Sequence, residues 1–134
     1  MLDSTAAVAA ERQGKNARQL LESVAREIGD DLIAVSVITV LELAHGIARA
    51  DTTERRNRRH RFLDELLTGV SVQPVTIPIA LRAGQIDGQS QAKGVRIPLS
   101  DLLIGASALE LDFAVGTANT RHFRLIPGLR VLQF

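Results

Sequence analysis

The sequence predicts an α/β fold, a three-layer α/β/α sandwich with a mostly parallel central sheet. Short apolar runs typical of buried strands alternate along the 134-residue chain with longer segments of helical period. Strands separated by helices are joined by crossover connections, which make the strands parallel and cover both faces of the sheet. A chain of this length fits one compact domain, which we expect to span residues 1–134.

Strands are expected where short apolar runs stand between polar or turn residues. Met1 and Leu2 begin a first strand that ends at Asp3. Pro74 indicates that the third run lies at a sheet edge or ends there, because proline cannot donate to a neighbouring strand. The five expected strands are residues 1–2, 32–36, 70–76, 113–118 and 129–134.

Helices are expected where apolar residues recur every three or four positions, as Leu20 and Val24 do. Gly94 supplies a stop for the helix before it. In the last helix Gly105 and Ala108 are small, so that this face can lie close to another element. Four of the five expected helices are residues 16–28, 38–50, 78–93 and 97–112. The remaining one follows a polar stretch that begins at residue 51, and apolar residues within 62–67 close it.

The composition excludes several classes of protein. No apolar run approaches the roughly 20 residues needed to cross a bilayer, so we expect no membrane insertion. The absence of cysteine excludes disulfides and thiolate metal sites and favours the cytoplasm. The net charge of +1 gives no global attraction to nucleic acid, although residues 55–61 gather five arginines and a histidine.

Three carboxylates are expected beyond the carboxyl ends of the strands, where open parallel sheets bind ligands. Asp3 follows the first strand, Glu42 lies on the helix after the second, and Asp101 is in the first turn of the last helix, whose dipole favours an ionised acid. Together they would repel one another unless a hard cation held them, and Mg²⁺ and Mn²⁺ prefer such oxygen ligands. Taken singly, each acid also fits an ordinary surface or helix-dipole position.

The sequence contains four segments with a distinctive order along nearly its whole length: MLDS, VSVITVLELAHGI, IPLSDLLIGASALEL and AVGTANTRHFRLIPGL. Together they resemble the PIN-domain ribonucleases, particularly the VapC-type toxins of bacterial toxin–antitoxin pairs. The resemblance implies a PIN-like fold and an endoribonuclease that hydrolyses RNA phosphodiester bonds with Mg²⁺ or Mn²⁺ as cofactor. It also implies a homodimer and a cognate antitoxin protein laid across the cleft.

The resemblance also implies roles for individual residues. Asp3, Glu42 and Asp101 match the acids that bind the metal, and Ser4 matches a hydroxyl that orients the first carboxylate or a water. Many family members have a fourth acid where this chain has Asn119. An amide can ligate a metal or position water but adds no charge, so we expect Asn119 to belong to the catalytic site and a single metal ion to bind without RNA.

Arginines are the candidates for contacts with the RNA backbone, which position RNA without reading its sequence. The candidates are Arg55, Arg56, Arg58, Arg59, Arg121 and Arg124.

Two other functions remain open at the level of sequence. A non-catalytic PIN-like module would bind RNA or a protein in the same cleft without cleavage, although three intact acids argue against it. Arg55 and His60 have the Arg-x4-His spacing of HEPN ribonucleases, which cut RNA without a metal. The HEPN fold is all-helical, and the strand-like runs argue against that alternative.

Overall fold

The strands form one parallel sheet, built around a single residue of the N-terminal segment. The computed structural model describes residues 1–134. Leu2 makes parallel bridges to Val35 on one side and to Gly116 on the other, which joins two strand pairs into the order β2, β1, Leu2, β3, β4. The strands are β1 (Ala34–Ser36), β2 (Ser71–Gln73), β3 (Val115–Thr117) and β4 (Val131–Gln133).

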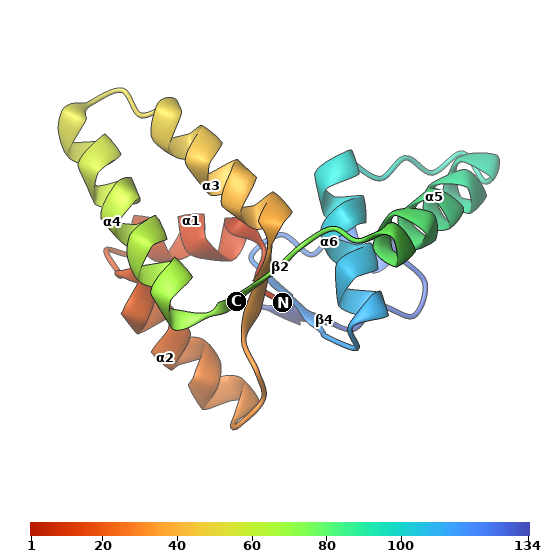
Figure 1. The fold of residues 1–134 in the computed structure, drawn as a ribbon, viewed down its shortest axis with the longest axis horizontal. Coiled ribbons are helices and arrows are strands. Elements are labelled where there is room, and N and C mark those ends of the chain that lie inside the picture. The colour runs from red at the N-terminus through yellow and green to blue at the C-terminus, as the bar shows by residue number, and fades with distance from the viewer.

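Helices cover both faces of this sheet. Figure 1 shows α1 to α4 on one side of the strands and α5 and α6 on the other, with both chain ends near the centre. None of the helices combines the length and apolar character needed to cross a membrane. The helices are α1 (Ser4–Arg12), α2 (Ala17–Ile28), α3 (Val37–Ala48), α4 (Thr53–Gly69), α5 (Ile77–Ala92), α6 (Leu99–Glu110) and the 3₁₀ helix η1 (Phe123–Leu125).

Two hydrophobic clusters lie in the fold, one for each helical layer. The first joins β3 to α5, α6 and η1 and includes Ile104 and Phe123, both fully buried. The second joins Leu2 and β1 to α1, α2 and α4 and includes Val24 and Leu66. A sheet with a separate core on each face is the three-layer α/β/α arrangement, so the predicted fold class is confirmed.

The expected elements agree with the structure apart from the N-terminal region. The predicted first strand is reduced to the Leu2 bridge, because the chain turns into α1 directly after Asp3. β2 pairs only with β1, which confirms the edge position indicated by Pro74. Gly94 follows α5 with a φ of +73°, a left-handed conformation that favours glycine at the end of a helix.

Helix α1 was not expected from the sequence, because its apolar face consists of alanines. Ala6, Ala7 and Ala10 are buried, yet such small side chains give little contrast between the two faces of a helix. Alanine has the highest helix propensity, and Asp3 caps the helix by accepting a hydrogen bond from the backbone N–H of Thr5. Asp3 therefore ends the extended segment at Leu2 and starts a helix at the same time.

Gly105 allows α6 to pack closely against the C-terminal segment, as its small size predicts. A Cβ atom at Gly105 would overlap Cδ1 of Ile126 and lie 3.4 Å from Cδ2 of Leu129. Ile126 is itself buried, so its side chain has little room to move away. The missing Cβ therefore sets the distance between α6, which carries Asp101, and the segment that follows η1.

We expect Gly105→Ala to lower the free energy of unfolding by about 1–3 kcal/mol, because the added methyl overpacks this contact. Chemical denaturation monitored by circular dichroism measures the change. Gly84→Ala is the matched control, since nothing lies within 4 Å of a Cβ built there in the exposed face of α5. That control should be neutral or stabilising by up to about 1 kcal/mol. Equal effects of the two substitutions would contradict the close packing at Gly105.

Candidate active site

Three carboxylates from separate elements lie in one region beside the sheet, close enough for two of them to act electrostatically on the third. Asp3 is 2% exposed and follows the central Leu2 bridge. Glu42 lies on α3, which contacts both α1 and α6, and Asp101 lies in the first turn of α6. The charges of Asp3 and Glu42 both act on the ionisation of Asp101, which places all three within electrostatic range.

Two threonine hydroxyls hold the buried carboxylate of Asp3. Thr5 Oγ1 donates to Asp3 Oδ2 at 2.6 Å, and Thr117 Oγ1 donates to the same oxygen at 2.9 Å. The Thr117 hydroxyl also accepts the backbone N–H of Asn119 at 3.0 Å, and that of Thr5 accepts the N–H of Ala118 at 3.1 Å. Neither threonine was predicted to belong to the site. Their position directly after the central segment and at the end of β3 is the signal that could have identified them.

Ser4 contacts a different carboxylate from the one predicted. Its hydroxyl donates to Glu42 Oε2 at 2.6 Å, whereas the prediction assigned it to the first acid or to a water. The difference arises because Asp3 caps α1, which turns the side chain of Ser4 away toward α3. Ser4 therefore links the start of α1 to the helix that carries Glu42.

Asp101 has a histidine partner. Its Oδ2 lies 2.7 Å from Nδ1 of His122, in the loop that leads into η1. Burial raises the pKa of the Asp101 carboxyl, the hydrogen bond from His122 opposes that shift, and the negative charges of Asp3 and Glu42 add to it. The charge of Asp101 is therefore costly in this position, which is the environment of an acid that benefits from a cation.

Each of the three acids keeps one oxygen without a protein partner. Asp3, Glu42 and Asp101 each bond through a single oxygen, Oδ2, Oε2 and Oδ2 respectively. No buried side-chain polar atom lacks a hydrogen bond, so the second oxygen of each reaches solvent, that of Asp3 only slightly because the residue is 2% exposed. Three solvent-accessible carboxylate oxygens form a donor set that suits Mg²⁺ or Mn²⁺.

These side chains do not stand close enough to share one ion as they are placed, because no group of three acidic or histidine residues has metal-binding spacing. Ser4 and His122 each bond one oxygen of Glu42 and Asp101, and the negative charges of the three acids repel one another. Since both side chains are only partly buried, a rotation about their side-chain bonds can bring the free oxygens closer together while these hydrogen bonds remain. The residues present therefore fit a divalent cation after a small rearrangement.

Asn119 borders the site from the loop after β3. Its backbone N–H donates to Thr117, which in turn holds Asp3. Its side chain is exposed, and Oδ1 accepts the N–H of Arg121 at 3.4 Å. Asn119 is thus linked to the carboxylate of Asp3 through hydrogen bonds of Thr117, and its side-chain amide is exposed to solvent.

Two grooves lie along α1. The inner groove, between α1, α3 and α4, has a volume of about 140 Å³ and includes Ser4, Glu42 and Arg59. The outer groove, between α1 and the loop after β3, has a volume of about 480 Å³. The residues that line the outer groove are Thr5, Val8, Ala9, Arg12, Gln13, Ala118 and Asn119.

The arginines proposed for RNA contacts have different surroundings. Arg59 is bound within the protein, because it pairs with Glu11 at 3.2 Å and donates to the carbonyl of Gly46 at 2.6 Å. We therefore reassign Arg59 to holding α4 against α1 and α3. The other five are exposed: Arg55, Arg56, Arg58, Arg121 and Arg124. Arg55 pairs with Asp51, and Arg56 donates to the carbonyl of Ala50.

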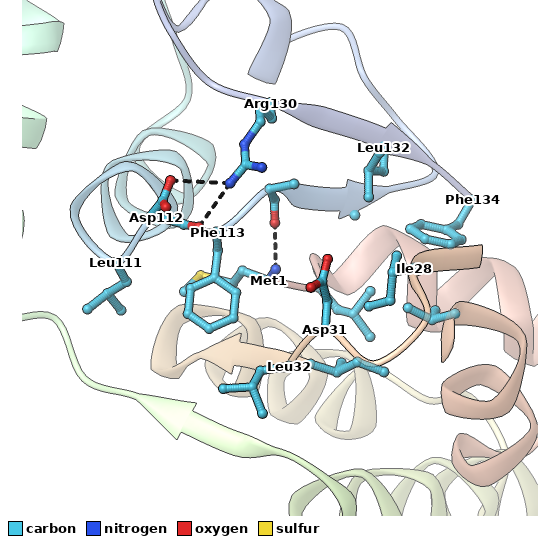
Figure 2. A pocket seen from close by; sticks show the side chains of 15 residues that line it. Met1, Ile28, Asp31, Leu32, Leu111, Asp112, Phe113, Arg130, Leu132 and Phe134 are labelled. Atoms are coloured by element: carbon cyan, nitrogen blue, oxygen red, sulfur yellow. Dashed lines mark hydrogen bonds and ion pairs between the residues drawn. The ribbon is translucent and has the colours of Figure 1, made fainter. Parts of the chain in front are cut away.

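A further cavity of about 480 Å³ lies at the opposite ends of the strands (Figure 2). Leu32 and Phe113 line it from the segments that enter β1 and β3. Its arginine, Arg130, pairs with Asp112, and most of its lining is hydrophobic. Ligand sites of parallel sheets lie at the other ends of the strands, so this cavity is not the candidate active site.

The chain is similar to known proteins over nearly its whole length. The family model described as PIN domain matches residues 1–129. Ribonuclease VapC10 from Mycobacterium tuberculosis is 34% identical over 130 residues, which cover 97% of this chain and 90% of the relative. The tRNA(fMet)-specific endonuclease VapC from Salmonella typhimurium is 27% identical over 99 residues, or 74% of this chain and 73% of that relative.

Solved structures share the fold over the full length of the chain. The crystal structure of VapBC2 from Rickettsia felis, bound to a DNA fragment from its promoter, has a chain that matches with a TM-score of 0.84 and 22% identity. That match covers 100% of this chain and 97% of the other. The crystal structure of FitAcB from Neisseria gonorrhoeae matches with a TM-score of 0.78, 26% identity and coverage of 98% and 94%. With a family model and a relative that both span nearly the whole sequence, the chain belongs to the PIN-domain family and, within it, to the VapC ribonucleases.

Proposed function

We propose that this protein is the endoribonuclease toxin of a toxin–antitoxin pair and that it hydrolyses RNA phosphodiester bonds with a divalent cation. Asp3, Glu42 and Asp101 would hold that cation through the oxygens that have no protein partner. The observation that carries this proposal is the arrangement of three carboxylates, each fixed through one oxygen and open to solvent through the other. When bound, Mg²⁺ or Mn²⁺ polarises the phosphate and favours ionisation of the attacking water.

The remaining site residues orient these acids. Thr5 and Thr117 keep the carboxylate of Asp3 in one orientation, and Ser4 does the same for Glu42. His122 occupies one oxygen of Asp101, which directs the other away from the histidine. The Asn119 amide can position water or a phosphate oxygen at the edge of the site, because it is both a donor and an acceptor.

The test is cleavage of a labelled single-stranded RNA by the purified protein with Mg²⁺ or Mn²⁺, followed by denaturing gel electrophoresis. We expect cleavage that stops in EDTA and returns when the cation is added in excess. An RNA that stays intact at every cation concentration would refute the proposal in favour of a non-catalytic binding module. Cleavage that continues in EDTA would refute the metal requirement.

The HEPN alternative is wrong for this chain. The parallel sheet and the PIN-domain match exclude an all-helical fold. Arg55 pairs with Asp51 at the exposed start of α4 and has no contact with the carboxylate site. The Arg-x4-His spacing of Arg55 and His60 therefore reflects an exposed helix.

We further propose a cognate antitoxin and a second copy of this chain as partners, in the cytoplasm. Solved structures that share this fold include toxin–antitoxin complexes, which supports the antitoxin. Large apolar side chains remain exposed on α3, β2, α5 and the start of α6, which supports a dimer surface. These residues are Val37, Leu41, Val72, Ile77, Leu81 and Leu99.

The neutral Asn119 limits the number of ions that the site can hold. Two dications about 4 Å apart repel strongly and need more anionic ligands than the three acids here. We expect one Mn²⁺ per chain in the absence of RNA, and we expect Asn119→Asp to tighten binding about ten-fold or more because it adds a charge beside the site. Isothermal titration calorimetry with Mn²⁺ measures both quantities.

Asn57→Asp is the matched control for this prediction, because Asn57 is an exposed amide on α4 outside both grooves. It should leave Mn²⁺ affinity unchanged. Two tight ions per chain in the unmodified protein would contradict the charge argument. Equal affinities for the Asn119→Asp variant and the parent would place Asn119 outside the site.

A further inference from the structure

We propose that the outer groove binds the RNA nucleotide adjoining the cleaved bond and that Arg12 contacts the phosphate of that nucleotide. This inference rests on the proposed nuclease function and assigns a subsite to it. Four observations carry it: the position of the groove next to the carboxylates, the alignment of its residues along α1, the chemistry of its walls and the free charge of Arg12.

The outer groove lies next to Asp3, separated from it by the side chains that hold this carboxylate. Thr5 lines its near end and donates its hydroxyl to Asp3 at 2.6 Å. Asn119 lines the opposite wall and is bonded through its backbone to Thr117, the second donor to Asp3. A phosphate bound at Asp3 would therefore have the groove as a neighbour, on the far side of Thr5 and Thr117.

The groove residues of α1 form one stripe that leads away from the site. Thr5, Val8, Ala9 and Arg12 are spaced by three, four and seven residues, which places them on one face of the helix. Seven residues of α-helix rise by about 10 Å. Arg12 thus lies at the far end of the groove, beyond a phosphate bound at the acids and beside the next unit of the RNA chain.

The walls suit a nucleotide held without stacking. Val8, Ala9 and Ala118 give an aliphatic surface for a ribose or base, and Gln13 and Asn119 bring amides that donate and accept hydrogen bonds. Base edges and 2′-hydroxyl groups need such partners. The volume of about 480 Å³ lies in the usual range of small-ligand pockets of 300–1,000 Å³.

The charge of Arg12 distinguishes the outer groove from the inner one. Arg12 is exposed and takes part in none of the ion pairs of the structure. In the inner groove the charge of Arg59 is neutralised by Glu11, and Glu42 adds a negative charge. A polyanion that leaves the site is therefore attracted to the outer side of α1.

The test compares RNA binding by four proteins that carry Asp101→Asn, so that RNA is not consumed. They are the single variant and three double variants, with Arg12→Gln, Ala9→Leu or Arg18→Gln added. Arg18 is the matched control, since it is an exposed helical arginine on α2 that pairs with Glu22 outside both grooves. The probe is a fluorescein-labelled, mixed-sequence RNA of eight nucleotides, and fluorescence anisotropy is recorded over a salt series in Mn²⁺.

We expect Arg12→Gln to weaken RNA binding about ten-fold at low salt, because it removes a charge-assisted phosphate contact. It should also reduce the slope of log affinity against log salt by about 0.7. Ala9→Leu should weaken binding without changing the slope, since it fills the groove and removes no charge. Arg18→Gln should change neither quantity.

Affinity and slope that are the same for Arg12→Gln and Arg18→Gln would overturn the subsite. So would RNA binding that is unchanged in Arg12→Gln while binding of the antitoxin is weakened, because the groove would then hold a peptide. The comparison does not depend on cleavage. A parent protein that binds RNA through Arg12 but fails to cut it would refute the proposed nuclease and leave the nucleotide subsite intact.

Discussion

Asp101→Asn is expected to abolish RNA cleavage, with a loss of about 10²–10³-fold or more in rate, while the protein stays folded. The substitution keeps the shape of the side chain and an acceptor for His122, but it removes one of three charges proposed to hold the cation. Burial and the nearby charges of Asp3 and Glu42 already raise the pKa of this carboxyl. A neutral side chain is therefore tolerated, and the midpoint of thermal unfolding in EDTA should equal or exceed that of the parent.

Asp64→Asn is the control for this result, because Asp64 is an exposed aspartate on α4. The same chemical change there should leave cleavage and stability unaltered. Initial rates of RNA cleavage and differential scanning calorimetry give the two readouts. Cleavage by the Asp101→Asn variant at the parental rate would show that Asp101 does not bind the cation, and cleavage lost together with the folded state would leave no evidence for a catalytic role.

The positions of the three acids along the chain were predictable from the sequence, because the ends of the strands and the starts of the helices were predictable. Asp3 follows an apolar pair, Asp101 opens an apolar helix, and Glu42 lies on the helix after a buried strand. In a parallel sheet these places meet at one edge, whatever the details of packing. The order of elements is therefore enough to bring the acids together.

The partners of these acids were not predictable, because they depend on local geometry. Ser4 reaches Glu42 rather than Asp3 only because α1 begins at once, and the alanine face of α1 gave too weak a periodic signal to place that helix. In the sequence Arg59 belongs to a basic stretch, yet it pairs with Glu11 because α4 packs against α1. Contacts between side chains 38 or 48 residues apart leave no local pattern in the sequence.

Thr117 shows most clearly what packing adds to the predicted site. Its side chain is fully buried, donates to Asp3 and accepts the N–H of Asn119. It touches neither the proposed cation nor the RNA, so it is a positioning residue that fixes the orientation of Asp3. A hydroxyl in this position stabilises the fold and sets the direction of the free oxygen of Asp3.

We expect Thr117→Val to lower the free energy of unfolding by about 1–3 kcal/mol, because the methyl group fills the same space but leaves the N–H of Asn119 unpaired. We expect metal affinity and kcat to fall by about 10–100-fold, as they do when a group that orients a metal ligand is lost. Thr117→Ser should restore most of both. Calorimetric titration with Mn²⁺ and cleavage kinetics measure the functional change, and urea denaturation measures the stability.

Thr39→Val is the matched control that separates orientation of Asp3 from simple stability. Thr39 is also a buried threonine, and its hydroxyl donates to the carbonyl of Leu2 at 3.1 Å without touching an acid. Both valine variants lose a buried hydrogen bond and should be destabilised to a similar extent. Only Thr117→Val should weaken Mn²⁺ binding. Equal Mn²⁺ affinities in the two variants would mean that Thr117 contributes to the fold alone and that the orientation of Asp3 is set elsewhere.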